Sequence, residues 1–175
     1  MAVFVGGATR AYDLTVADAE KLLSILEKST ADVGGYVLTT SRRTTVGVER
    51  FLKHQIELQQ PTLCQKLVIA SEDPRPFVVK GMLAWAKMIV VTEDSLAMIS
   101  EAVAVGKPVI VLKTASQALP EKHRRFLESL THRGLVTAAS FSDLGRYLSG
   151  VLPSAGTDAI AREKQILTQE LEKLL

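Results

Sequence analysis

The sequence predicts an α/β fold built on a doubly wound parallel sheet. Short runs of β-branched and aliphatic residues alternate with longer segments whose apolar residues recur at helical spacing. Residues 90–112 show this alternation most clearly, because they contain a buried strand, a polar turn, a helix and a second buried strand in order. Strands that alternate with helices form parallel βαβ units, and 175 residues that are 47% hydrophobic can bury one substantial core.

The elements follow one another along the whole chain. Strands are predicted at residues 3–5, 36–39, 67–69, 88–91, 109–112 and 135–137, and helices at residues 16–28, 46–58, 78–86, 95–105, 121–132 and 141–148. Thr15 is the expected N-cap of the first helix, with Asp18 and Glu20 in its first turns. Gly106 and Pro108 mark the end of the 95–105 helix and the entry to the next strand.

The sequence predicts one folded domain followed by a C-terminal helical segment. We expect residues 1–155 to form one Rossmann-like nucleotide-binding domain. Residues 158–175 place their apolar side chains on one stripe, which predicts an amphipathic helix. This C-terminal segment, residues 156–175, is expected to pack on the domain or on an N-terminal Rossmann-like domain of a longer protein.

Composition narrows the function classes. The net charge is +2 and the basic residues are dispersed, so we expect no nucleic-acid partner. A single cysteine, Cys64, excludes an internal disulfide and a cysteine-based zinc site, and the three histidines lack metal-ligand spacing. The apolar runs are strand-sized and no signal peptide is recognisable, so we expect no transmembrane segment and a cytoplasmic location.

A glycine turn closes the first strand. Gly6 and Gly7, followed by Thr9, would let main-chain N–H groups approach a phosphate, because no Cβ stands in the way. A plain tight turn fits the same residues. The turn is neither the GxGxxG dinucleotide fingerprint nor a P-loop, because the third glycine and the GK[ST] ending are absent.

A basic, hydroxyl-rich turn follows the second strand. Ser41, Arg42 and Arg43 combine a hydroxyl group and guanidinium groups with the free N–H groups of a helix start, which suits a pyrophosphate. A solvated helix start is the alternative. In a parallel sheet this turn lies at the same carboxyl edge as the Gly6–Gly7 turn. Residues 71–76, after the third strand, are interpreted as a proline-stiffened loop.

The fourth strand leads into a helix that carries both a hydroxyl and a carboxylate. Ser95 would offer its hydroxyl and a helix-terminal N–H to phosphate, and Glu101 lies about 9 Å further along the axis, where a ribose needs an acceptor. An ordinary exposed helix carboxylate is the alternative for Glu101. Glu93 and Asp94 at the same helix end would repel phosphate, so the two arginines would have to offset them.

These residues carry a resemblance to GT-B glycosyltransferases. The stretch from Ser95 through Glu101 to Pro108 is similar to the donor-site helix of that fold. The resemblance implies a nucleotide sugar, such as a UDP- or GDP-sugar, as ligand and no metal or other cofactor. It implies that Glu101 holds the ribose, that Gly6 and Gly7 approach the diphosphate, and that Ile69 and Ala70 frame the base.

A closer resemblance covers the chain to about residue 136. Four blocks, at residues 6–7, 41–44, 81–86 and 91–102, are similar to the mitochondrial-fission "elongate mitochondria" family of plants and bacteria. Thr45 departs from the proline usual in that family. The plant members imply a protein partner related to dynamin. Neither a GxxGxxG turn nor a Tyr-xxx-Lys pair supports a sugar-nucleotide epimerase.

The sequence therefore supports three functional hypotheses. The first is the donor-binding domain of a GT-B-like, metal-independent glycosyltransferase-related protein, which would be inactive alone because its acceptor-binding domain is missing. The alternative is a non-catalytic protein-interaction domain. An NAD(P)-binding module is disfavoured by the glycine spacing. No catalytic residue is assigned.

Overall fold

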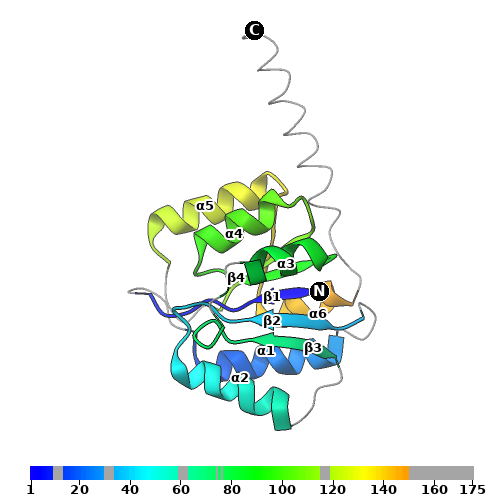
Figure 1. Cartoon of the computed structure of the whole chain (residues 1–175). Helices are drawn as coiled ribbons and strands as arrows, with labels where there is room; N and C mark the ends of the chain where they lie inside the picture. Colours follow the sequence, from blue (N-terminus) through cyan, green and yellow to red (C-terminus); the bar gives the residue numbers. More distant parts are fainter. Residues whose placement is uncertain are drawn as a thin grey trace, which may run out of the picture.

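The computed structural model describes residues 1–9, 14–29, 34–58, 63–73, 75, 77–114 and 119–149. The helix expected at residues 158–175 lies outside them. Six parallel strands form one sheet in the order β3-β2-β1-β4-β5-β6, which confirms the doubly wound, Rossmann-like fold (Figure 1). The strands are β1 (Ala2–Phe4), β2 (Tyr36–Thr39), β3 (Cys64–Val68), β4 (Ile89–Thr92), β5 (Val109–Leu112) and β6 (Thr137–Ala139).

Within the described residues, three helices cover each face of the sheet. α1 (Val16–Ser29), α2 (Val46–Leu58) and α6 (Phe141–Leu148) lie on one face, and α3 (Phe77–Trp85), α4 (Leu96–Ala104) and α5 (Glu121–His132) lie on the other (Figure 1). The core accordingly forms two buried clusters, one on each face. In β1, Val3 belongs to the α1 side whereas its neighbours Ala2 and Phe4 belong to the α4 side, as the two-residue period of a strand requires.

Four strands differ from the sequence prediction: β1 and β4 are displaced by one residue, and β3 and β6 differ by more. The edge strand β3 begins at Cys64, three residues before the predicted start, because Gln65 and Lys66 face solvent and escape a search for apolar runs. β6 begins two residues later than predicted. Leu135 is buried, but its N–H donates to Leu130 in the turn that ends α5, where Gly134 adopts a φ of 68°.

Two predicted helix-end signals, Thr15 before α1 and Gly106 after α4, are confirmed. The Thr15 hydroxyl accepts a hydrogen bond from the Asp18 N–H (3.1 Å), and the Asp18 carboxylate accepts one from the Thr15 N–H (3.1 Å). Gly106 follows α4 with a φ of 70°. The next residue, Lys107, donates through Nζ to the carbonyl oxygens of Leu83 and Ala84, which closes the end of α3.

The order of the strands changes direction between β1 and β4, and this position is the switch point of the sheet. Because all strands are parallel, the loops that follow β1, β2, β3 and β4 meet at one carboxyl edge around this switch point. No helix in the described ranges combines the length and apolar character needed to cross a bilayer.

Candidate functional site

A cleft of about 1200 Å³ opens at the carboxyl edge of the sheet. Its walls are the loops after β1, β2, β3 and β4 together with the starts of α3, α4 and α5. The structure brings together seven of the ten residues that the sequence singled out: Thr9, Ser41, Arg42, Arg43, Ala70, Ser95 and Glu101. Gly6, Gly7 and Ile69 are not among the lining residues, and Ile69 is buried.

The N–H groups of the glycine turn are hydrogen-bonded within the protein. The Gly6 N–H donates to Thr92 Oγ1 (2.8 Å), and the Gly7 N–H donates to Asp94 Oδ2 (2.9 Å). Thr92 Oγ1 in turn donates to Asp94 Oδ1 (2.6 Å). The loop after β1 is thereby joined to the loop after β4, and Asp94 occupies the position that the sequence analysis gave to a phosphate.

The same contacts explain why both turn positions are glycine. A Cβ on Gly6 would lie 1.8 Å from Asp94 Oδ1, and a Cβ on Gly7 would lie 2.1 Å from main-chain atoms of Arg43. Both distances are far below van der Waals contact. Close packing of three loops therefore accounts for these glycines without a ligand.

Asp94 also forms an ion pair with Arg43, and both residues line the cleft. Its side chain is fully buried (0% exposed) and lies 3.3 Å from Nη2 of Arg43, whose side chain is 46% exposed. Arg43 therefore supplies the positive charge that is expected to offset the negative charge of Asp94. Glu93 points elsewhere: its carboxylate accepts a hydrogen bond from the Thr114 N–H (3.0 Å), outside the cleft lining.

Thr44 fixes the basic turn against the glycine turn. Its hydroxyl donates to the Gly6 carbonyl oxygen (2.7 Å) and accepts from the Ser41 N–H (2.9 Å). The Ala8 N–H donates to the Arg43 carbonyl oxygen (3.0 Å), which ties the two turns a second time. Arg42 stays exposed at the cleft and has no ion pair with any described residue.

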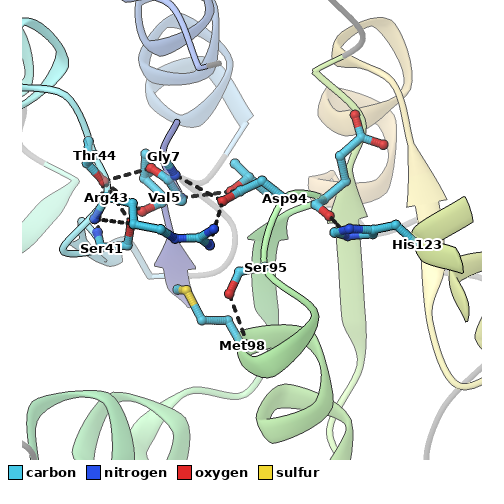
Figure 2. A network of polar contacts seen from close by, with 12 residues as sticks. Val5, Gly7, Ser41, Arg43, Thr44, Asp94, Ser95, Met98 and His123 are labelled. Atoms are coloured by element: carbon cyan, nitrogen blue, oxygen red, sulfur yellow. Dashed lines mark hydrogen bonds and ion pairs between the residues drawn. The ribbon is translucent and has the colours of Figure 1, made fainter. Parts of the chain in front are cut away.

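The start of α4 forms the opposite wall. Ser95 is its N-cap and accepts a hydrogen bond from the Met98 N–H (3.4 Å), as predicted for a helix start (Figure 2). Glu101 lies in the second turn, exposed and lining the cleft. Within the described part of the chain its carboxylate forms neither a hydrogen bond nor an ion pair, so it is open to a ligand hydroxyl.

A buried carboxylate that the sequence analysis missed organises the loop after β3. Glu49 accepts hydrogen bonds from the hydroxyls of Thr40 (3.1 Å) and Ser71 (2.7 Å), and Thr40 accepts one from the Ala70 N–H (2.9 Å). Glu49 sits in the first turn of α2, where a carboxylate is expected for the helix dipole alone. Only the fold reveals that it faces two hydroxyls from other loops.

The loop after β3 also presents an arginine to the cleft. Arg75 donates to the Asp73 carboxylate through Nε (2.5 Å) and Nη2, which lowers the pKa of Asp73. Its guanidinium lies 5.5 Å from the centre of the Phe77 ring. This loop, which the sequence predicts only to be stiffened by prolines, thus contributes the Arg75 guanidinium to the cleft, held in place by Asp73. The spacing of the residues did not reveal that role.

One histidine completes the cleft. His123 Nε2 lies 2.6 Å from the Glu93 carbonyl oxygen, and because a carbonyl oxygen can only accept, Nε2 carries the hydrogen of this contact (Figure 2). The sequence gives the three histidines no role in a site, because they lack metal-ligand spacing. The neighbouring Arg124 and Arg125 form ion pairs with Glu121 on α5.

Comparisons with known proteins identify the family. The sequence profile described as Mitochondrial fission ELM1 matches residues 1–165. The Mitochondrial fission protein ELM1 of Arabidopsis thaliana is 32% identical over 139 residues, which is 79% of this chain and 29% of the plant protein. The chain therefore spans less than a third of that relative, and no solved structure matches it. The chain belongs to the mitochondrial fission ELM1 family.

Proposed function

We propose that this domain binds the nucleotide-sugar donor of a GT-B-like, metal-independent glycosyltransferase-related protein. One observation carries the proposal. Arg42, in the loop after β2, and Glu101, in helix α4 after β4, lie on opposite sides of the switch point, line one cleft and have no ion pair with any described residue. An unpaired cation and an unpaired carboxylate that share a cleft suit a ligand with a phosphate at one end and hydroxyls at the other.

Each part of the ligand has a matching group. Arg42, the Ser41 hydroxyl and the outer N–H groups of Arg43 would hold phosphate at the start of α4. Glu101, in the second turn of α4, would accept hydrogen bonds from the ribose. The Ala70 region, fixed through Thr40, would frame the base.

The size of the cleft fits a site shared between domains. A volume of about 1200 Å³ exceeds the ~300–1000 Å³ of most small-molecule pockets. The chain covers 29% of its plant relative, so a second domain of the longer protein would close the cleft and supply acceptor recognition. This chain alone should bind nucleotide without turning it over.

Isothermal titration calorimetry tests the proposal. Uridine and guanosine nucleotides and their sugar conjugates are titrated into the wild type, Arg42→Ala and Glu101→Gln, with NADPH as the comparison ligand. We expect each substitution to weaken nucleotide affinity by about tenfold, the loss of one charge-assisted hydrogen bond. Arg125→Ala and Glu20→Gln, exposed residues outside the cleft lining, are the matched controls. No binding at millimolar nucleotide overturns the proposal.

A non-catalytic interaction domain is the second candidate. It is favoured by two large aromatic side chains that α3 leaves in solvent, Phe77 (61% exposed) and Trp85 (54% exposed). Such a domain does not require Arg42 or Glu101 to contact a ligand. Nucleotide binding that is weakened about tenfold in Glu101→Gln but not in Glu20→Gln therefore decides against it.

A further inference from the structure

We propose that Asp94 sets the charge of the cleft so that it selects a donor joined through a single phosphate over one joined through a diphosphate. This inference rests on the proposed function and specifies its substrate class as a nucleoside monophosphate sugar. Asp94 acts through Arg43 and the glycine turn, so it is a specificity-determining residue that need not touch the sugar.

The formal charges that line the cleft cancel, because three arginines stand against three carboxylates, those of Asp73, Asp94 and Glu101. Arg75 is paired with Asp73, and Arg43 is paired with Asp94. Among the described lining residues this leaves Arg42 as the unpaired arginine near the start of α4. A single phosphodiester can be neutralised by one guanidinium, whereas a diphosphate brings at least one further negative charge.

The main-chain N–H groups of Gly6 and Gly7 already donate hydrogen bonds within the protein. The Gly7 N–H donates to the Asp94 carboxylate and the Gly6 N–H donates to Thr92, so neither is open to a second phosphate. The Asp94 side chain is fully buried and accepts from Gly7, Thr92 and Arg43. A second phosphate placed against this turn would have to displace the Asp94 carboxylate or lie beside it. Two negative charges in van der Waals contact repel each other strongly.

Arg43 can still assist the first phosphate. One hydrogen bond, from Nη2, joins it to Asp94, and its side chain is 46% exposed at the cleft. A guanidinium has five N–H donors, so several remain for a ligand oxygen. Arg43 therefore supplies donors while its net charge is cancelled, and Arg42 supplies the charge.

The test compares ligands that differ by one phosphoryl group. Calorimetry with the monophosphate and diphosphate of the same nucleoside (cytidine, uridine and guanosine in turn) gives a ratio of affinities that does not depend on the base. The wild type is expected to bind each monophosphate at least as tightly as its diphosphate. Asp94→Asn removes one negative charge and should shift the ratio towards the diphosphate by about tenfold.

Glu93→Gln is the matched control, because Glu93 is the neighbouring buried carboxylate but is outside the cleft lining. It should leave the ratio unchanged, and an equal shift in this variant overturns the assignment to Asp94. A wild type that prefers diphosphates also overturns the inference, and this arm holds even if Asp94→Asn fails to fold. No binding of any nucleotide refutes the proposed function itself, which is a distinguishable result.

Discussion

The Asp94 carboxylate accepts a hydrogen bond from the main-chain N–H of Gly7, at 2.9 Å, across the switch point between β1 and β4. Glycine-turn N–H groups in parallel sheets are suited to bind anions, and here the anion is a side chain of the same protein. The contact is part of a junction of three loops, because Arg43 joins Asp94 from the loop after β2. The stability of this junction can be measured without any ligand.

Gly7→Ala should destabilise the domain by about 2 kcal/mol, the usual cost of overpacking. The new Cβ would lie 2.1 Å from the Arg43 main chain, which cannot rotate away as a flexible side chain can. Urea unfolding measures the change. Gly81→Ala in α3 is the control: nothing lies within 4 Å of its Cβ position, so it should stabilise the domain by ~0.5–1 kcal/mol. Equal effects at the two glycines would contradict the packing argument.

Thr44→Val should cost about 1–3 kcal/mol, because it leaves the buried Gly6 carbonyl oxygen without its hydroxyl donor. The substitution keeps the shape of the side chain, so the loss reports the hydrogen bonds and not a cavity. Thr137→Val in β6, where no side-chain hydrogen bond is present within the described chain, should change the free energy of unfolding little. A neutral Thr44→Val would show that the junction does not depend on this hydroxyl.

Lys107→Met should destabilise the end of α3 by about 1–2 kcal/mol. The Nζ group donates to the carbonyl oxygens of Leu83 (2.7 Å) and Ala84 (2.6 Å), which methionine cannot do. Hydrogen exchange of the last α3 turn should accelerate together with the loss in thermal stability. Lys80→Met, an exposed position on the same helix, is the control and should leave that exchange unchanged.

Asp143 predicts an acid-dependent loss of stability. The Ser140 hydroxyl donates to its carboxylate (2.6 Å), which lowers the pKa of Asp143 below its ordinary value of 3.8. A carboxyl whose folded pKa is depressed stabilises the fold above its unfolded pKa, and the contribution disappears as the pH falls through the lower folded value. The difference in melting temperature between the wild type and Asp143→Asn should therefore be present at neutral pH and shrink below pH 3.8.

Glu57→Gln, an exposed position at the end of α2 whose side chain has no hydrogen bond with a described residue, should show no such acid-dependent difference. A gap between the wild type and Asp143→Asn that is constant over pH 3–7 would exclude the proposed contribution of the carboxylate charge.

The elements of this fold were predictable because local and tertiary preferences agree. α2, α5, α6, β2 and β5 begin and end at the predicted residues, since apolar periodicity and end signals mark both limits. The predicted edge strand β3 begins three residues too late, because solvent on one side of the strand permits polar residues such as Lys66. Periodicity records burial, so it detects edge strands poorly.

The candidate site was predictable only to the level of loops. Parallel topology alone places Ser41, Arg42 and Ser95 at one edge, and the structure brings them into one cleft. Partner choice within the edge was not predictable: nothing local indicates that the Gly7 N–H meets Asp94, or that Glu49 meets two hydroxyls. Such contacts depend on strand order, which sequence periodicity does not encode.

The position of β1 has a consequence for how the chain matures. Val3 pairs with Leu38 on one side and with Val90 on the other, so the first strand of the described sheet is also one of its two central strands. During synthesis β1 can join β2 soon after emerging, but its second edge stays open until β4 has left the ribosome. An open central edge invites pairing with other chains, so the interval before β4 arrives is the period in which the nascent domain is most exposed to aggregation.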